Sequence, residues 1–168
     1  MACGTHALPL FNVQYQLVFQ MLPTAGAFLR LLRETAGLLY GYPALGYFLP
    51  AHRGDDHHIV EDEPLSQFYT PLGGWRLQVL EYDKKYVHDK LVQQSFVPAP
   101  GSRGLERIVY EYESATGKKG KLDVHFQVLW GIIYGSLFEI PCAAERNFFT
   151  GWGAVSLYWD QTFQTEVG

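Results

Sequence analysis

Two stretches of alternating apolar and polar residues constrain the fold of this chain more than any other feature. Apolar side chains recur at every second position from Ile108 to Tyr112, and the same period recurs from Leu122 to Tyr134. A two-residue period places these side chains on one face of a β-strand. The segment between them, residues 114–120, is polar and contains glycine, as a hairpin loop does. The sequence therefore predicts a long antiparallel hairpin with one aromatic-rich face.

The other periodic segments predict further strands and one main helix. Residues 11–21 and 75–79 alternate as strands do, and a last strand is expected around residues 155–159. Pro23 or Thr24 can open a helix whose apolar face recurs at helical spacing and whose end is at Gly37 or Gly41. That face consists of Ala25, Phe28, Leu29, Leu32, Ala36 and Leu39.

Two segments are ambiguous. In residues 83–96, Val87 and Leu91 fit a helix, while the even-numbered positions fit a strand. We predict a strand there because its neighbours are strands. Residues 143–149 are predicted to form a short helix, and no long C-terminal helix is expected.

Length and composition favour one folded domain over residues 1–168. A chain of 168 residues can bury a sizeable core, and its 48% hydrophobic content argues against disorder. Aromatic residues reach 15%. This enrichment is typical of β-rich folds, and it also suits an aromatic-walled pocket for a flat or apolar ligand. The two interpretations are compatible.

Charge and cysteine content exclude several classes. The formal net charge is -4, and no basic cluster exceeds a lysine pair, so nucleic-acid binding is not expected. Two cysteines, Cys3 and Cys142, form no disulfide framework or metal motif. The first ten residues do not resemble a signal peptide, and residues 128–140 are too short for a membrane span. We therefore predict a cytoplasmic protein.

Four residues are candidates for proton transfer. Glu81 is the first choice, because the parity of Trp75, Leu77 and Val79 places its carboxylate on the apolar face. A carboxyl group buried on such a face can act as an acid or base at neutral pH. The weaker candidates are His58, His125 and Tyr110. His125 shares the polar parity of its strand, which favours the surface or the rim of a cavity.

Six aromatic residues are predicted to bind a hydrophobic substrate. They are Tyr15, Phe19, Trp75, Tyr112, Phe126 and Trp130. Residues 51–63 combine three histidines with five carboxylates, yet the spacing lacks the pattern of a metal site. We interpret this segment as an exposed loop, and otherwise as a lid over a pocket. No metal is expected.

No cofactor is expected either, because dinucleotide, phosphate-loop and serine-hydrolase motifs are absent from the sequence. Residues 11–32, with a strand, then Pro23, then an amphipathic helix, resemble the start of helix-grip domains (START-like and polyketide-cyclase domains). A lipocalin-like barrel and an NTF2-like cone also suit many aromatic strands. The expected fold is therefore α+β, a curved antiparallel sheet or barrel with one main helix around an apolar cavity.

Three functions fit this expectation. The first is a cofactor-independent cyclase, isomerase or lyase that acts on a hydrophobic small molecule held in the cavity. The second is a binding protein for a lipid, a pigment or an aromatic metabolite. The third is an oligomeric interaction module, such as a homodimer, with exposed aromatic residues including Trp152 and Trp159 at its interface.

Overall fold

The computed structural model describes residues 5–9, 25–41, 44, 74–102, 104, 106–114, 117–129, 131 and 146–157. These residues form strands, two α-helices and a 3-10 helix, η1. In chain order the elements are β1 (Thr5–Pro9), α2 (Ala25–Thr35), β2 (Leu38–Tyr40), β3 (Trp75–Leu80), η1 (Glu81–Asp83), α5 (Lys84–Gln93), β4 (Val97–Pro98), β5 (Arg107–Glu113), β6 (Lys119–Gln127), β7 (Asn147–Phe149) and β8 (Gly153–Leu157).

The strands form one open, mixed sheet in the order β1-β8-β7-β2-β3-β6-β5-β4. All described neighbours are antiparallel except β3 and β6, which run parallel. The predicted α+β class is confirmed, whereas the prediction of a wholly antiparallel sheet is wrong at this pair. Parallel neighbours need a crossover connection. Here α5 leaves the end of β3, and the chain returns through β4 and β5 to β6.

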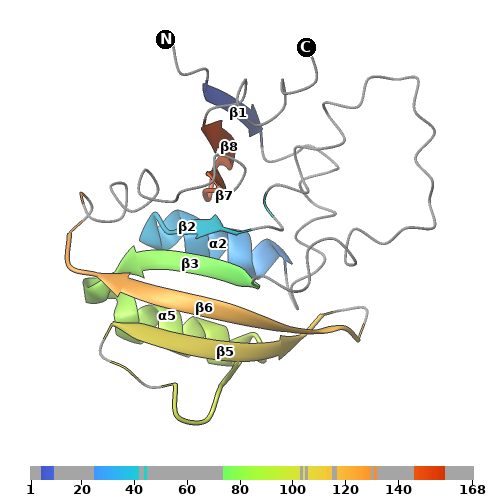
Figure 1. Cartoon of the computed structure of the whole chain (residues 1–168), viewed down its shortest axis with the longest axis vertical. Helices are drawn as coiled ribbons and strands as arrows, with labels where there is room; N and C mark the ends of the chain where they lie inside the picture. Colours follow the sequence, from blue (N-terminus) through green and yellow to red (C-terminus); the bar gives the residue numbers. More distant parts are fainter. Residues whose placement is uncertain are drawn as a thin grey trace, which may run out of the picture.

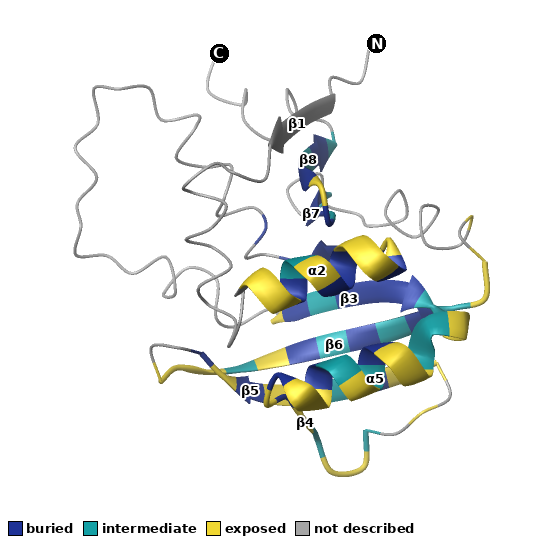
Figure 2. Cartoon of the chain, turned by 180° about the vertical axis from the view of Figure 1, so that it is seen from behind, coloured by how far each residue is buried: buried dark blue, intermediate teal, exposed yellow. Residues whose placement is uncertain are grey.

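Both helices lie on one face of the sheet (Figures 1 and 2). In Figure 2, α2 lies over β3 and α5 lies over β6 and β5, and their sheet-facing residues are buried. Phe28 and Leu32 of α2 pack into the same core as Val87 and Leu91 of α5. The two-layer arrangement buries the apolar stripe of each helix against the apolar face of the strands.

The predicted strand over residues 83–96 is wrong, because α5 occupies most of it. Val87 and Leu91 are fully buried and lie one helical turn apart. Tyr86 and Val92, which a strand would have placed on the same face, are both exposed. The helix ends where the backbone N–H of Gln94 bonds to the carbonyl groups of Lys90 and Leu91.

The main predicted helix exists but ends earlier than expected. Ala36 has a left-handed backbone (φ 49°) directly after the last helical residue, Thr35. The N–H of Gly37 then bonds to the carbonyl oxygen of Leu32 at 3.0 Å. This pairing is the Schellman C-cap, which stops a helix and turns the chain. Leu39 consequently lies in strand β2 and not on the helix.

The central hairpin is confirmed. β5 and β6 pair with Tyr110 opposite Leu122 and Ile108 opposite Val124, and these side chains are buried as the parity predicts. The return strand is shorter than predicted, since β6 ends at Gln127 and Val128 is exposed.

Among the remaining segments, the strands predicted at residues 75–79 and 155–159 correspond to β3 and to the end of β8. The short helix predicted over residues 143–149 is wrong at its end, which forms β7. The strand predicted over residues 11–21 lies outside the described residues. Within the described part of the chain, neither helix has the length and apolar character needed to cross a membrane.

Candidate functional site

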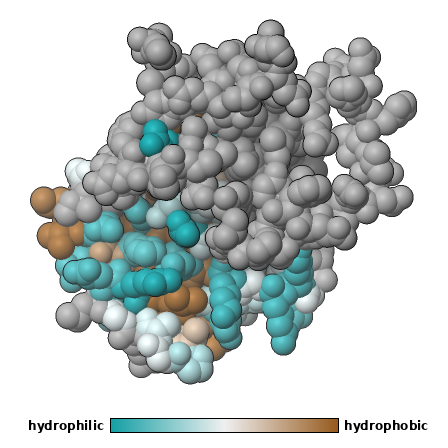
Figure 3. Space-filling view, in the orientation of Figure 1, coloured by the Kyte–Doolittle hydropathy of each residue, from teal (hydrophilic) through white to brown (hydrophobic). Residues whose placement is uncertain are grey.

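Charged side chains gather on the face of the sheet opposite the helices. Asp123 and His125 alternate along β6 with Leu122, Val124 and Phe126, which point into the core. Arg107 of β5 lies directly opposite His125 in the antiparallel register. In Figure 3, which views this face, hydrophilic residues gather where β3, β6 and β5 lie in Figure 1.

Asp123 is the centre of this group. Its carboxylate accepts two hydrogen bonds from Arg107, one from Nε at 2.7 Å and one from Nη2 at 2.8 Å. His125 Nε2 lies 3.2 Å from the second carboxylate oxygen. Burial alone would raise the pKa of Asp123, but hydrogen bonds from His125 and Arg107 outweigh it and lower the pKa to about 2. The carboxylate is therefore ionised throughout the neutral range.

The ionised carboxylate fixes the tautomer of the imidazole. Because Asp123 can only accept hydrogen bonds, Nε2 of His125 must carry a proton. In neutral His125 the lone pair then lies on Nδ1, which is the basic nitrogen. The His125 side chain is 30% exposed, whereas that of Asp123 is 19% exposed. This arrangement leaves the imidazole partly accessible and its orienting partner mostly covered.

We call Arg107, Asp123 and His125 the β6 cluster. It borders a second, largely apolar group on the same face. In the parallel register Gln78 of β3 lies beside His125. The Gln78 side-chain amide donates a hydrogen bond of 3.0 Å to the Tyr40 hydroxyl, and both residues are buried. Tyr40 belongs to a buried apolar group with Leu38 and Phe148, and this group packs against Leu80, Val155 and Leu157. The β6 cluster thus lies between an exposed charged surface and an apolar one.

Arg76 adds a second cation next to the β6 cluster. It is the register partner of Asp123 in β3, and it is half-buried. No salt bridge joins Arg76 to another residue in the part of the chain that the structure describes. Because side chains on the same face of adjacent strands are within reach of each other, Arg76 can approach a group bound at His125.

Tyr110, a second predicted candidate, lies on the opposite, helix-covered face. Its side chain is fully buried, and its hydroxyl is 2.8 Å from Nδ1 of His88 on α5. This hydrogen bond satisfies a phenol in the core. The pair is therefore separated from His125 by the sheet.

Glu81 belongs neither to the β6 cluster nor to the buried pair of Tyr110 and His88. It follows β3 as the first residue of η1, and its side chain is exposed. The parity argument does not extend to Glu81, because β3 ends at Leu80 and the backbone turns into the 3-10 helix. His58 lies outside the described residues.

The aromatic candidates that the structure describes lie in the core. Trp75 and Phe126 are almost fully buried, and Tyr112 packs against Phe96 with ring centroids 5.1 Å apart. Burial raises the pKa of Tyr112 to about 12. Tyr15, Phe19 and Trp130 lie outside the described residues, and the ligand-binding role of all six aromatic residues stays a prediction.

Sequence reasoning missed Asp123, Arg107 and His88. Asp123 could have been found, because it lies two residues before His125 and therefore on the same strand face. Arg107 required the hairpin register, and His88 required the helix. Within the described ranges, no group of three or more His, Cys, Asp or Glu side chains could hold a metal ion.

Comparisons with known proteins add no functional assignment: no family model matches the chain, and no curated protein or solved structure matches it.

Proposed function

We propose that this protein is a cofactor-independent enzyme that moves a proton on a small organic molecule, with His125 as the acid–base residue. The observation that carries the proposal is the pairing of the partly exposed His125 with the ionised, mostly covered carboxylate of Asp123. A carboxylate that orients an imidazole and stabilises its protonated form is a recurrent arrangement in general acid–base catalysis.

In the proposed reaction, His125 moves a proton and the substrate undergoes no net oxidation or reduction. Nδ1 takes a proton from the substrate, and the resulting imidazolium is stabilised by Asp123. The partly exposed imidazolium exchanges this proton with solvent. It then delivers a proton to another carbon atom of the substrate in an isomerisation, or to a leaving group as the bond between that group and the substrate breaks in a lyase reaction. No external oxidant or reductant is needed.

The surroundings support a substrate with an apolar part and a polar reacting part. Gln78 connects His125 to the apolar group around Tyr40 and Phe148 on the same face. The aromatic candidates Trp75, Tyr112 and Phe126 lie in the core on the other face of the sheet. The apolar part of the substrate is therefore proposed to contact the group around Tyr40 and Phe148. The sequence-based candidate Glu81 is the competing acid or base, exposed at the end of β3.

The experiment uses the full-length protein in D2O with a protein-free extract of small metabolites. Mass spectrometry follows each metabolite that is consumed and any deuterium that appears in its product. We expect deuterium incorporation with the wild type and a rate at least about a hundredfold lower with His125→Gln, since general acid–base catalysis contributes on this scale.

Lys121→Gln is the matched control. Lys121 lies on the same face of β6 and is mostly exposed, in a 3.5 Å pair with Glu111, and its replacement should leave the rate unchanged. A rate lost in Glu81→Gln but kept in His125→Gln would transfer the role to Glu81. A metabolite retained by both variants without any deuterium would instead identify a binding protein and reject the enzyme.

A further inference from the structure

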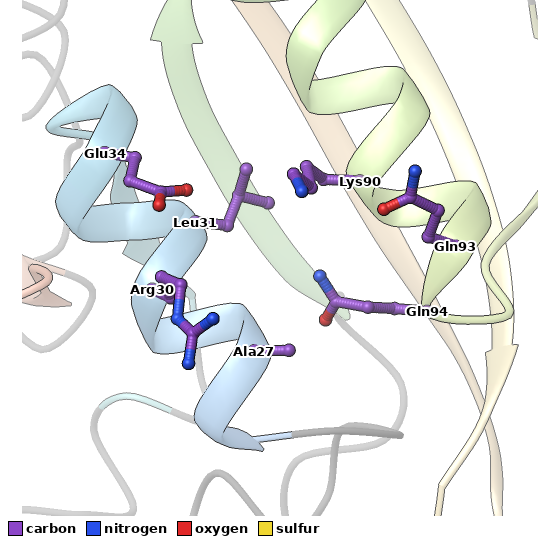
Figure 4. Close-up of a pocket in the computed structure, with 7 residues that line it drawn as sticks. All are labelled: Ala27, Arg30, Leu31, Glu34, Lys90, Gln93 and Gln94. Carbon is purple, nitrogen blue, oxygen red and sulfur yellow. The ribbon is translucent and has the colours of Figure 1, made fainter.

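A pocket opens between the two helices, on the face of the sheet opposite the β6 cluster. It has a volume of about 310 Å³ and is lined by Ala27, Arg30, Leu31, Glu34, Lys90, Gln93 and Gln94. Figure 4 shows that these side chains come from α2, from α5 and from Gln94 directly after α5, and that several point into the space between the helices. We call this space the α2–α5 pocket.

We propose that the α2–α5 pocket binds a small organic anion, a carboxylate or phosphate monoester with a polar body. Two cations from facing helices, Arg30 and Lys90, line it against one carboxylate, that of Glu34. Glu34 already accepts a hydrogen bond from the Tyr86 hydroxyl. Two cations and one carboxylate give the lining a net charge of +1, and arginine and lysine are the side chains that bind carboxylate and phosphate groups.

The uncharged residues that line the α2–α5 pocket indicate the chemistry of the rest of the ligand. Leu31 is almost fully buried and forms an apolar base, while Gln93 supplies an amide group beside it. Amides both donate and accept hydrogen bonds, which suits a polar ligand body. A volume of about 310 Å³ is at the lower end of ligand pockets, so the ligand is a small metabolite and not a lipid or a dinucleotide.

Lys90 is held near the pocket by its own surroundings. Its Nζ lies 5.5 Å from the centroid of the Tyr86 ring, a cation–π distance, and its side chain is half-buried. Tyr86 also binds Glu34 of the other helix. The same tyrosine thus positions one charged group from each wall.

The experiment is an NMR titration of the ¹⁵N-labelled full-length protein with citrate and, separately, with inorganic phosphate. Glycerol is the uncharged probe. We expect saturable shifts of backbone amides in residues 27–34 and 90–94 with at least one of the anions and none with glycerol. Lys90→Gln should weaken binding about tenfold, because it removes a charge-assisted contact.

Lys85→Gln is the matched control, because Lys85 belongs to the same helix but its side chain is 93% exposed and pairs with Asp89. It should bind as tightly as the wild type. Ala27→Leu, which fills the pocket wall without changing charge, should also weaken binding. Equal weakening in Lys85→Gln and Lys90→Gln, shifts confined to β5 and β6, or no saturable shift with either anion would overturn the proposal.

Discussion

At the residue scale, Asp123 determines the properties of the proposed site. Its two carboxylate oxygens contact Arg107 and His125, so one side chain both orients the imidazole and places a negative charge beside it. An ion pair of this kind contributes more than an isolated surface pair, because the geometry is bidentate and the carboxylate is mostly covered.

The lowered pKa of Asp123 predicts a pH dependence of stability. Because the pKa falls from 3.8 to about 2 on folding, the stabilisation is complete above the unfolded value and is lost as the pH falls through the folded value. The shift corresponds to at most about 2 kcal/mol, and solvent around the exposed Arg107 reduces it to about 1–2 kcal/mol. Urea unfolding between pH 6 and pH 2 should therefore show a smaller loss in Asp123→Asn than in the wild type.

The matched control for this pH measurement is Asp89→Asn. Asp89 forms an exposed 3.6 Å pair with Lys85 within α5, and such pairs contribute little. This variant should keep the pH dependence of the wild type. If Asp123→Asn also keeps it, the β6 cluster does not stabilise the carboxylate as its geometry indicates.

Much of the β6 cluster could be predicted from sequence, but its assembly could not. The alternation along residues 122–126 places Asp123 and His125 together on the polar face. Arg107 joins them because the hairpin pairs Glu113 with Lys119, which sets Arg107 opposite His125. A register shifted by one residue would have moved Arg107 to the other face, and the composition of the loop does not fix the register to one residue.

At the element scale, the β7–β8 turn approaches α2 closely. A Cβ atom on Gly151 would overlap with the backbone N and Cα atoms of Arg33. The Arg33 guanidinium in turn donates to the Gly151 carbonyl oxygen at 3.4 Å and lies 4.6 Å from the centroid of the Trp152 ring. The turn and the helix therefore fit together only with glycine at position 151.

This fit predicts opposite results for two glycine-to-alanine changes. Gly151→Ala should lower the free energy of unfolding by roughly 1–3 kcal/mol, because backbone atoms must move to admit the methyl group. Gly26→Ala in α2 meets no atom within 4 Å and should raise it, by up to about 1 kcal/mol, through helix propensity. Denaturant unfolding measures both. A neutral Gly151→Ala would show that the turn does not press on α2.

Two short strands that are buried on both faces, and one helix with few buried residues, explain the errors in the predicted secondary structure. All three residues of β2 and all three of β7 are buried, so neither strand shows an alternating pattern. In α5 only Val87 and Leu91 are buried, and two positions do not separate a helical period from a strand period. The parallel pairing of β3 with β6 follows from this helix, which is why the sheet topology was also mispredicted.

At the scale of the whole molecule, one apolar core joins nearly all the described elements. Phe28 of α2, Val87 of α5, Trp75 of β3, Tyr110 of β5 and Phe149 of β7 belong to the same buried cluster. The two proposed sites lie on either side of this layer, the β6 cluster on the open face and the α2–α5 pocket on the helical face. A shared core predicts that both helices and the sheet unfold together.

Phe28→Ala tests this cooperativity. Phe28 is fully buried and packs against Phe96, with ring centroids 6.0 Å apart. Its truncation should cost about 3–5 kcal/mol, a large share of the roughly 5–15 kcal/mol typical of a folded domain. Far-UV circular dichroism and tryptophan fluorescence, which includes buried Trp75, should report the same lowered midpoint.

The control is Val92→Ala, a truncation on α5 at a side chain that is 47% exposed, which should change stability by no more than about 0.5 kcal/mol.

Separate transitions in the circular dichroism and fluorescence signals would mean that α2 and its strands unfold independently of the β3–β6–β5 part. The α2–α5 pocket would then be formed between two units and would open when either one unfolds. Coincident transitions would instead mean that its walls are held by the same core that supports the β6 cluster. Core substitutions would in that case weaken both sites together, whereas Lys90→Gln and His125→Gln would each affect only one.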